Sequence, residues 1–304
     1  MRKELLLLGA FGMLTTATLC AQEFHLQPTP QEYITQKDSV DIPRQYQILS
    51  GNSVQDGPAL PLLRSLMPEE VLGASFRVYI GVKGDKIIKK YQHRIPRKSE
   101  GYFLKIEKDC IVIAGADERG AYYGVQTLAQ LLALDKLPLA EVTDYPDVPY
   151  RGVVEGFYGA PWSQEACIRQ LDFYGRNKMN VYIYGPKDDP YHRTPNWRKP
   201  YPAREGEELK VLVNRAKENN VIFYWAIHPG QDIRWNEEDR SLLLQKFESM
   251  YQLGVRGFAV FFDDISGEGT KADKQAELLN YIDDHFVKVK RDVAPLILCP
   301  TEYN

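Results

Sequence analysis

The most constraining feature of this sequence is an alternation, from residue 151 onward, between short apolar runs and longer amphipathic runs. Near-continuous apolar runs are typical of strands buried on both faces, and amphipathic helices between them favour βα units in a parallel sheet. The sequence predicts five strands, over residues 151–159, 180–187, 221–230, 257–266 and 296–304. It predicts four helices between them, over residues 163–178, 205–220, 237–254 and 273–292.

Functional groups lie at the C-terminal ends of the expected strands, as in Glu155-Gly156-Phe157-Tyr158-Gly159, His228-Pro229-Gly230 and Asp263-Asp264. A (β/α)8 TIM barrel presents such groups at the C-terminal ends of its eight strands, whereas a doubly wound sheet uses one glycine-rich turn. No Gly-x-Gly-x-x-Gly motif follows the first strand. We therefore expect an α/β fold with an incomplete TIM barrel of about five strands, truncated within the catalytic barrel at Asn304.

Residues 22–147 have the pattern of a small, non-catalytic α+β domain, which precedes the catalytic part at residues 148–304. Alternating and β-rich runs predict strands over residues 76–80, 102–106 and 110–114, the last two as a hairpin. A helix is expected after Gly120. The basic stretch 83–98 is interpreted as a solvated hairpin or loop.

The first 21 residues have the pattern of a secretory signal peptide, with Arg2 and Lys3 ahead of an apolar run. We therefore expect a periplasmic or secreted protein. A lipoprotein anchor on Cys20 is the less favoured alternative, because the residues before it fit that signal poorly. No later run is long and apolar enough to predict a membrane span.

Composition excludes several classes of function. A formal net charge of −3 gives no general attraction to nucleic acid. The histidines lack the spacing of metal ligands, and no P-loop or Gly-x-Ser-x-Gly elbow is present. We expect no metal and no cofactor, and the sequence predicts no particular oligomeric state.

The strongest chemical signal is Asp263-Asp264, directly after the apolar run 258–262. Burial of a carboxylate is unfavourable unless it is paired or used. Mutual repulsion should hold one aspartate ionised and raise the pKa of the other, which suits an acid and an anionic stabiliser. The alternative is an exposed loop start or a cap of the next helix.

Other candidates have equally ordinary alternatives. Lys187 could bind a sugar hydroxyl or be a surface lysine paired with a neighbouring aspartate. His228 is interpreted as a structural histidine at a strand end. Four loop aromatics could stack on a sugar or pack in the core: Tyr158, Trp162, Trp197 and Trp235.

Three segments in this order resemble glycoside hydrolase family 84, the β-N-acetylglucosaminidases of the O-GlcNAcase type, and are similar to its Bacteroides-type members. They are residues 151–159 (RGVVEGFYG), 184–191 (YGPKDDPY) and 261–265 (FFDDI). Residues 102–132 look like the small domain that precedes hexosaminidase barrels. The resemblance covers essentially the whole chain after residue 21.

The resemblance implies a retaining, substrate-assisted exo-hydrolase for terminal β-linked N-acetylglucosamine, including that on Ser or Thr of glycoproteins. The acetamido oxygen of the substrate is then the nucleophile and forms an oxazoline. Asp263 would orient the acetamido group, and Asp264 would be the general acid and base. The substrate-binding residues would be Gly156, Tyr158, Lys187 and Tyr303.

Two alternatives remain from the sequence. A family 20-type β-hexosaminidase would carry an Asp-Glu pair, which Asp263-Asp264 does not match. A catalytically inactive sugar-binding fragment is the other alternative. Because later pocket residues of the family fall beyond Asn304, we expect the 304-residue chain by itself to be poorly active. In both enzyme interpretations the partner is a glycan or glycoprotein.

Overall fold

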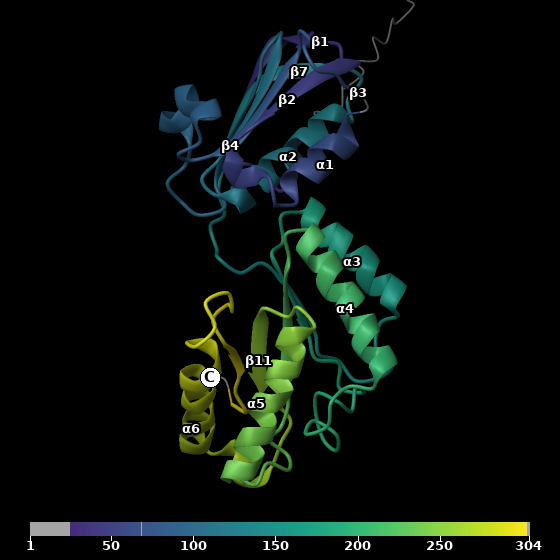
Figure 1. Ribbon diagram of the computed structural model, residues 1–304, viewed down its shortest axis with the longest axis vertical. Coiled ribbons are helices and arrows are strands. Elements are labelled where there is room, and N and C mark those ends of the chain that lie inside the picture. Colours follow the sequence, from purple (N-terminus) through teal and green to yellow (C-terminus); the bar gives the residue numbers. More distant parts are fainter. Residues whose placement is uncertain (1–24, 68, 303–304) are drawn as a thin grey trace, which may run out of the picture.

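The protein is built from two sheets, one above the other along the long axis of the molecule (Figure 1). The computed structural model describes residues 25–67 and 69–302. The expected signal peptide, residues 1–21, lies outside the described residues.

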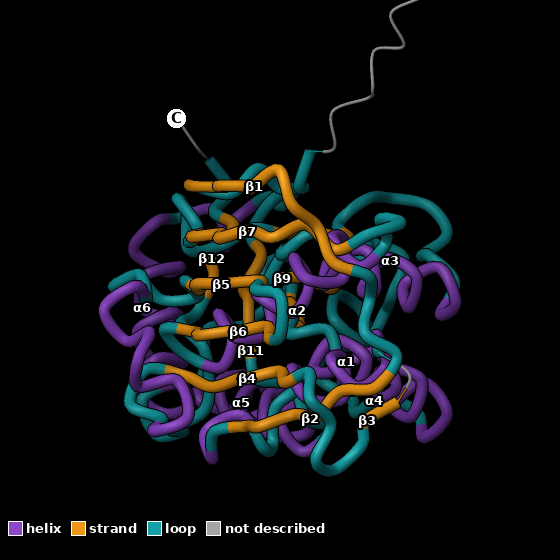
Figure 2. The backbone as a smooth tube through the Cα atoms, turned by 90° about the horizontal axis from the view of Figure 1, so that it is seen from above, coloured by secondary structure: helices purple, strands orange, loops and turns teal. Residues whose placement is uncertain are grey.

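The first sheet has seven strands in the order β1-β7-β5-β6-β4-β2-β3 (Figure 2). The strands are β1 (Glu32–Val40), β2 (Gln45–Ser50), β3 (Glu69–Glu70), β4 (Arg77–Val82), β5 (Tyr102–Ile106), β6 (Cys110–Gly115) and β7 (Leu137–Asp144). The expected hairpin is present, since β5 pairs with β6 antiparallel from Tyr102↔Gly115 to Ile106↔Ile111. Strands β1, β2, β3 and β7 were not predicted.

Helices α1 (Ala59–Leu66) and α2 (Glu118–Leu132) cover one face of this sheet (Figure 1). Asp117 begins α2, because its side chain accepts a hydrogen bond from the backbone N–H of Gly120 at 2.8 Å. The opposite face is covered by a 3₁₀-helical segment, Lys86–Arg94. The interpretation of this stretch as a solvated hairpin or loop was wrong, because Ile88 is buried against Phe103 and Val112.

The second sheet is parallel throughout, in the order β12-β11-β10-β9-β8. Its strands are β8 (Gly152–Glu155), β9 (Val181–Tyr184), β10 (Ile222–Ile227), β11 (Gly257–Phe261) and β12 (Ile297–Cys299). The intervening helices are α3 (Gln164–Arg176), α4 (Ala203–Glu218), α5 (Glu237–Gln252) and α6 (Ala272–Ile282), which continues into a π-helical turn at Asp283–Val287. The expected fold class, a small sheet domain followed by an incomplete TIM barrel, is confirmed.

Alternate residues of each parallel strand point to opposite faces of the curled sheet. The outer face packs against the helices through large side chains such as Tyr182, Trp225 and Phe258. The inner face carries a separate cluster, which includes Ile183, Ala226, Ala259 and Phe261. This alternation matters for the site, because it sets which residues beyond the strand ends point into the barrel.

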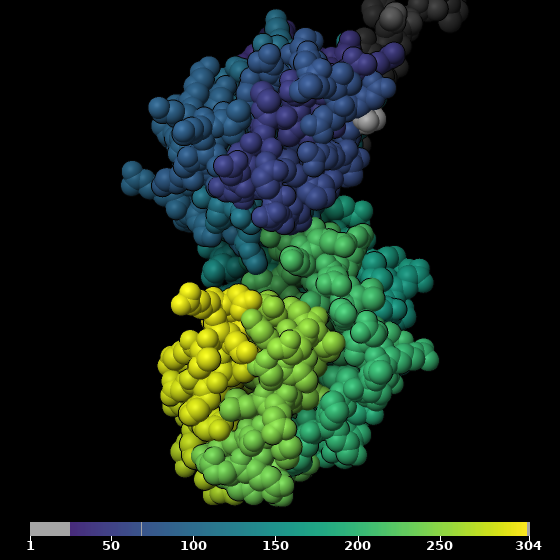
Figure 3. All heavy atoms as spheres, in the orientation of Figure 1, coloured from purple at the N-terminus to yellow at the C-terminus, as the bar shows by residue number. Residues whose placement is uncertain are grey.

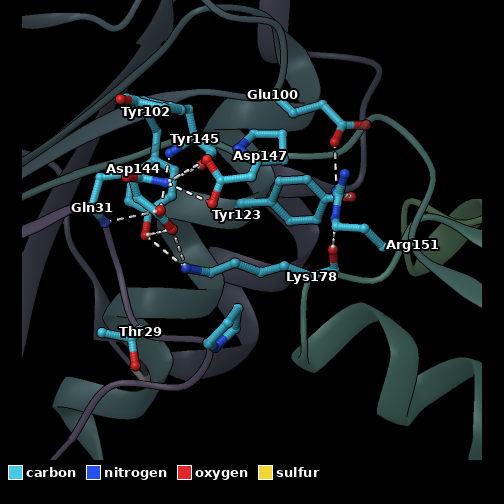
Figure 4. Close-up of a pocket in the computed structure, with 12 residues that line it drawn as sticks. Thr29, Gln31, Glu100, Tyr102, Tyr123, Asp144, Tyr145, Asp147, Arg151 and Lys178 are labelled. Carbon is cyan, nitrogen blue, oxygen red and sulfur yellow. Dashed lines mark hydrogen bonds and ion pairs between the residues drawn. The ribbon is translucent and has the colours of Figure 1, made fainter.

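The first sheet contacts the N-terminal edge of the barrel, and a narrow waist separates the two parts on the surface (Figure 3). Lys178, just before β9, donates hydrogen bonds to Asp144 and Tyr102 of the first sheet, both at 2.8 Å. Arg151, just before β8, bonds Glu100 at 2.5 Å (Figure 4). The C-terminal ends of the parallel strands lie at the other edge, so the first sheet leaves them uncovered.

Candidate active site

Three polar residues, each just beyond the end of one strand, lie in line with the inner-face positions of three successive strands. Lys187 continues the inner series of β9, His228 that of β10, and Asp263 that of β11. Because the strands are parallel, their C-terminal ends meet at one edge, and the three side chains come within contact distance there.

Lys187 and Asp263 form an ion pair in which the lysine is buried and the aspartate is half-buried. The Nζ of Lys187 lies 2.5 Å from Oδ2 of Asp263, and 2% of the lysine side chain is exposed. The alternative that Lys187 is a surface lysine paired with a neighbouring aspartate is therefore wrong. Whether Lys187 also binds a sugar stays a prediction.

Asp263 is held in its ionised form. Burial by itself raises the pKa of this carboxyl, but nearby His228 and Lys187 lower it by more, so the pKa of Asp263 lies well below its ordinary value. Oδ2 is engaged by Lys187, whereas the buried Oδ1 has no hydrogen-bond partner among the described residues. Nε2 of His228 lies 3.5 Å from this oxygen.

Asp264 is exposed, and the backbone at this residue leaves the extended conformation of the strand. Its φ of 53° lies in the left-handed region, which is unfavourable for a residue with a side chain and is tolerated better by Asp and Asn than by most others. Its Oδ2 accepts a hydrogen bond from the hydroxyl of Tyr158 at 3.0 Å, and this bond raises the pKa of Tyr158. The adjacent aspartates therefore have different environments, since Asp263 is half-buried and Asp264 is exposed.

Tyr158 and Gly156 lie in the loop after β8, whereas the sequence predicted a strand as far as residue 159. The ring of Tyr158 is 60% exposed, and the Nζ of Lys187 lies 5.9 Å from its centre. Tyr158 therefore joins the same cluster as Lys187, Asp263 and Asp264. Gly156 directly follows β8, and Tyr303 lies outside the described residues, so the binding roles of both stay predictions.

Glu155 fixes the start of this loop and was not singled out in the sequence. It is fully buried at the end of β8, where it accepts hydrogen bonds from the backbone N–H of Trp162 at 2.9 Å and from the hydroxyl of Tyr182. Burial raises the pKa of Glu155, although these hydrogen bonds oppose the rise. Its contacts tie residues 156–162 to the outer face of the sheet.

His228 is the residue whose connection to the site sequence reasoning missed. It is 1% exposed, and its Nε2 lies 2.7 Å from the backbone oxygen of Asp263. The available signal was its position, directly after the strand that neighbours the one ending at Asp263.

The loop aromatics do not all remain available for a sugar. Trp197 is fully buried and donates its indole N–H to Asp232 at 2.7 Å, so it is a packing residue. Trp162 and Trp235 are half-buried and pack against the outer core. Tyr158 is the member of this group that lies beside the paired aspartates.

Two further searches covered the described part of the chain. Over residues 25–67 and 69–302, no group of three or more His, Cys, Asp and Glu side chains is arranged to hold a metal ion. Within the same ranges, no helix has both the length and the apolar character needed to cross a membrane.

A family profile described as beta-N-acetylglucosaminidase matches residues 151–304, just over half of the chain and including all the site residues above. The chain belongs to the β-N-acetylglucosaminidase family. A second profile, domain 2 of glycosyl hydrolase family 20, matches residues 23–145. The resemblance to glycoside hydrolase family 84 is confirmed.

Individual proteins and solved structures are also similar to this chain. The proteins named Protein O-GlcNAcase in Rattus norvegicus and Mus musculus are each 37% identical over 158 residues, which is 50% of this chain and 17% of theirs. The solved structure of CpGH84B is 37% identical with a TM-score of 0.86, covering 92% of this chain and 51% of that one. The chain thus spans about half the length of that structure and less of the curated relatives.

Proposed function

We propose that this protein is a retaining exo-β-N-acetylglucosaminidase that hydrolyses terminal β-linked N-acetylglucosamine by substrate-assisted catalysis. The observation that carries the proposal is the different environment of the two adjacent aspartates at the end of β11. Asp263 is half-buried, ionised and paired with Lys187, whereas Asp264 is exposed beside Tyr158. A mechanism with one anionic stabiliser and one proton-transfer group needs this division.

Asp263 suits the first role because one of its oxygens is available. Oδ1 is buried and lacks a hydrogen-bond partner among the described residues, so it can accept the N–H of the substrate acetamido group. That contact directs the acetamido oxygen toward the anomeric carbon. Positive charge develops on the acetamido group as the oxazoline forms, and the fixed carboxylate stabilises it.

Asp264 suits the second role because it is exposed, so that it can reach a leaving group and a water molecule. It donates a proton to the glycosidic oxygen as the bond from that oxygen to the anomeric carbon breaks. Water then attacks the oxazoline, and Asp264 takes a proton from that water. The product keeps the β configuration, and the acetamido group is regenerated.

The substrate would be a glycan or glycoprotein that presents a terminal N-acetylglucosamine, including one linked to Ser or Thr. The O-GlcNAcase name of the rodent relatives supports this choice. A family 20-type hexosaminidase is less well supported, since Ile265, not a glutamate, follows the paired aspartates.

The proposal is tested by incubating the full-length protein with an aryl β-N-acetylglucosaminide and recording the proton NMR spectrum during the reaction. We expect the β anomer of free N-acetylglucosamine to appear first. A thiazoline analogue of the oxazoline should inhibit competitively. First appearance of the α anomer would contradict the mechanism, and absence of turnover would contradict the activity.

We also propose that the protein is exported. The support is the charged and then apolar pattern of residues 1–21, which lie outside the described residues. Cell fractionation with N-terminal sequencing is the test. A cytosolic protein that keeps Met1 would contradict export.

A further inference from the structure

The backbone that leads to the paired aspartates, from Phe262 to Asp263, is held from the strands on both sides. Phe262 donates its backbone N–H to Cys299 at 2.8 Å, and the Phe262 carbonyl accepts the hydroxyl of Thr301 at 2.7 Å. These contacts come from the β12 side. The next carbonyl along the chain, that of Asp263, is bound from the β10 side by His228.

The direction of that last hydrogen bond follows from its acceptor. A backbone carbonyl has no hydrogen to give, so Nε2 of His228 must carry the proton and donate at 2.7 Å. The same nitrogen lies 3.5 Å from Oδ1 of Asp263, beyond an ordinary hydrogen bond. His228 therefore donates a hydrogen bond to the backbone carbonyl of Asp263. Its ring lies near the Asp263 carboxylate but leaves Oδ1 without a hydrogen bond.

The carbonyl of Asp263, which His228 binds, belongs to the peptide that directly precedes the left-handed turn at Asp264. The φ of 53° at Asp264 is a rotation about the bond that directly follows this peptide. In a regular strand the two aspartates would point to opposite faces of the sheet. The left-handed turn changes the direction of the Asp264 side chain, and it persists only where the surroundings hold it.

We propose that His228 is a positioning residue that fixes the peptide between Asp263 and Asp264 and so sets the relative direction of the two carboxylates. The inference rests on the proposed roles of these aspartates. His228 is well placed for this task because its own position is fixed. Its backbone N–H donates to the carbonyl of His192 at 2.7 Å, and its side chain is almost completely buried.

The test compares three variants at position 228 in the full-length protein. The amide nitrogen of glutamine can reach the position of the ring Nε2, whereas that of asparagine is too short and leucine has no donor. We expect His228→Leu and His228→Asn to lower kcat on an alkyl β-N-acetylglucosaminide by roughly 10–100-fold, the range for a small misplacement of catalytic groups. His228→Gln should recover most of the rate.

Tyr224→Phe is the matched control. Tyr224 lies on the same strand and inner face, and its hydroxyl donates to the carbonyl of Pro295 at 3.1 Å, away from the aspartates. This variant loses a side-chain-to-carbonyl hydrogen bond of the same kind and should keep the wild-type kcat. Equal effects of Tyr224→Phe and His228→Leu would overturn the proposal, as would equal activity of the Gln and Asn variants.

A second readout does not depend on turnover. In protein labelled with ¹³C at the aspartate carboxyls, the Asp263 signal should titrate at higher pH in His228→Leu and His228→Asn than in wild type. An unchanged titration in both variants would overturn the role of His228. If the wild-type protein hydrolyses no N-acetylglucosaminide, the proposed function fails, and this titration still decides whether His228 controls Asp263.

Discussion

The Nζ of Lys187 lies 2.5 Å from Oδ2 of Asp263 inside the barrel, although the two residues are 76 positions apart in the sequence. A buried charge that loses its partner is strongly destabilising, whereas removal of both charges is often tolerated. This pair therefore joins the stability of the fold to the chemistry of the site.

We predict that Lys187→Met and Asp263→Asn each lower the free energy of unfolding by about 3 kcal/mol at pH 7. The double variant should be more stable than the sum of the single losses implies, because neither charge remains. Urea denaturation of the four proteins gives the coupling. Strict additivity would contradict a coupled pair. Any kinetic study of Asp263 variants needs this measurement to separate lost folding from lost catalysis.

The roles of the two aspartates predict different dependence on the leaving group. Acid assistance matters most for a poor leaving group, so Asp264→Ala should lose roughly 10²–10⁴-fold on an alkyl or Ser-linked sugar. It should lose much less on a nitrophenyl glycoside in the first step. Asp263→Ala should slow both substrates by comparable factors, on the order of 10²-fold or more. Rates for a series of aryl leaving groups decide the assignment, and a steep dependence for Asp263→Ala would reverse it.

The contact between the two sheets depends on a buried lysine. Lys178 bonds Asp144 and Tyr102, and its side chain is 7% exposed. Lys178→Met leaves Asp144 without its cationic partner and should lower the free energy of unfolding by about 3 kcal/mol. Lys210→Met, which removes an exposed pair with Glu207, is the control and should change little. Equal effects of the two substitutions would contradict a structural role for Lys178.

Lys246 predicts a pH dependence of stability. Burial lowers the pKa of Lys246 to about 7, although Asp189 opposes the change. Its Nζ donates to the carbonyl of Lys199 at 2.6 Å and lies 4.2 Å from the ring centre of Tyr201. The unfolded chain keeps the ordinary, higher lysine pKa. The charged form of Lys246 therefore lowers the free energy of unfolding by its full amount below pH 7. This loss of stability becomes smaller as the pH rises above 7.

Lys246→Met removes this penalty. The free energy of unfolding of the variant should exceed that of the wild type by a larger amount at pH 6 than at pH 9. Urea denaturation at the two pH values measures the difference. A relative stability that is constant, or that increases toward pH 9, would show that burial does not control Lys246.

Local pattern was sufficient for much of the fold. Apolar runs and helical periodicity predicted every strand and helix from β8 to β12, although most elements are shorter than expected. Ser163, the first residue of the helix predicted over 163–178, caps α3, since its hydroxyl accepts the backbone N–H of Ala166 at 3.2 Å. The paired aspartates were also visible, because charged residues directly after a buried strand are conspicuous. These features depend on neighbours in the chain, so the sequence by itself determined them.

The tertiary structure decided which distant side chains meet. It paired Lys187 with Asp263, placed His228 behind the same aspartate, and buried Trp197 in the outer core. It also placed the polar-looking segment Lys86–Arg94 on an apolar sheet face. Periodicity along one strand contains no information on the distance to the next strand or on the register between them. The pairing of these side chains, their burial and the ionisation of Asp263 therefore arise only when the parallel strands bring their C-terminal ends together.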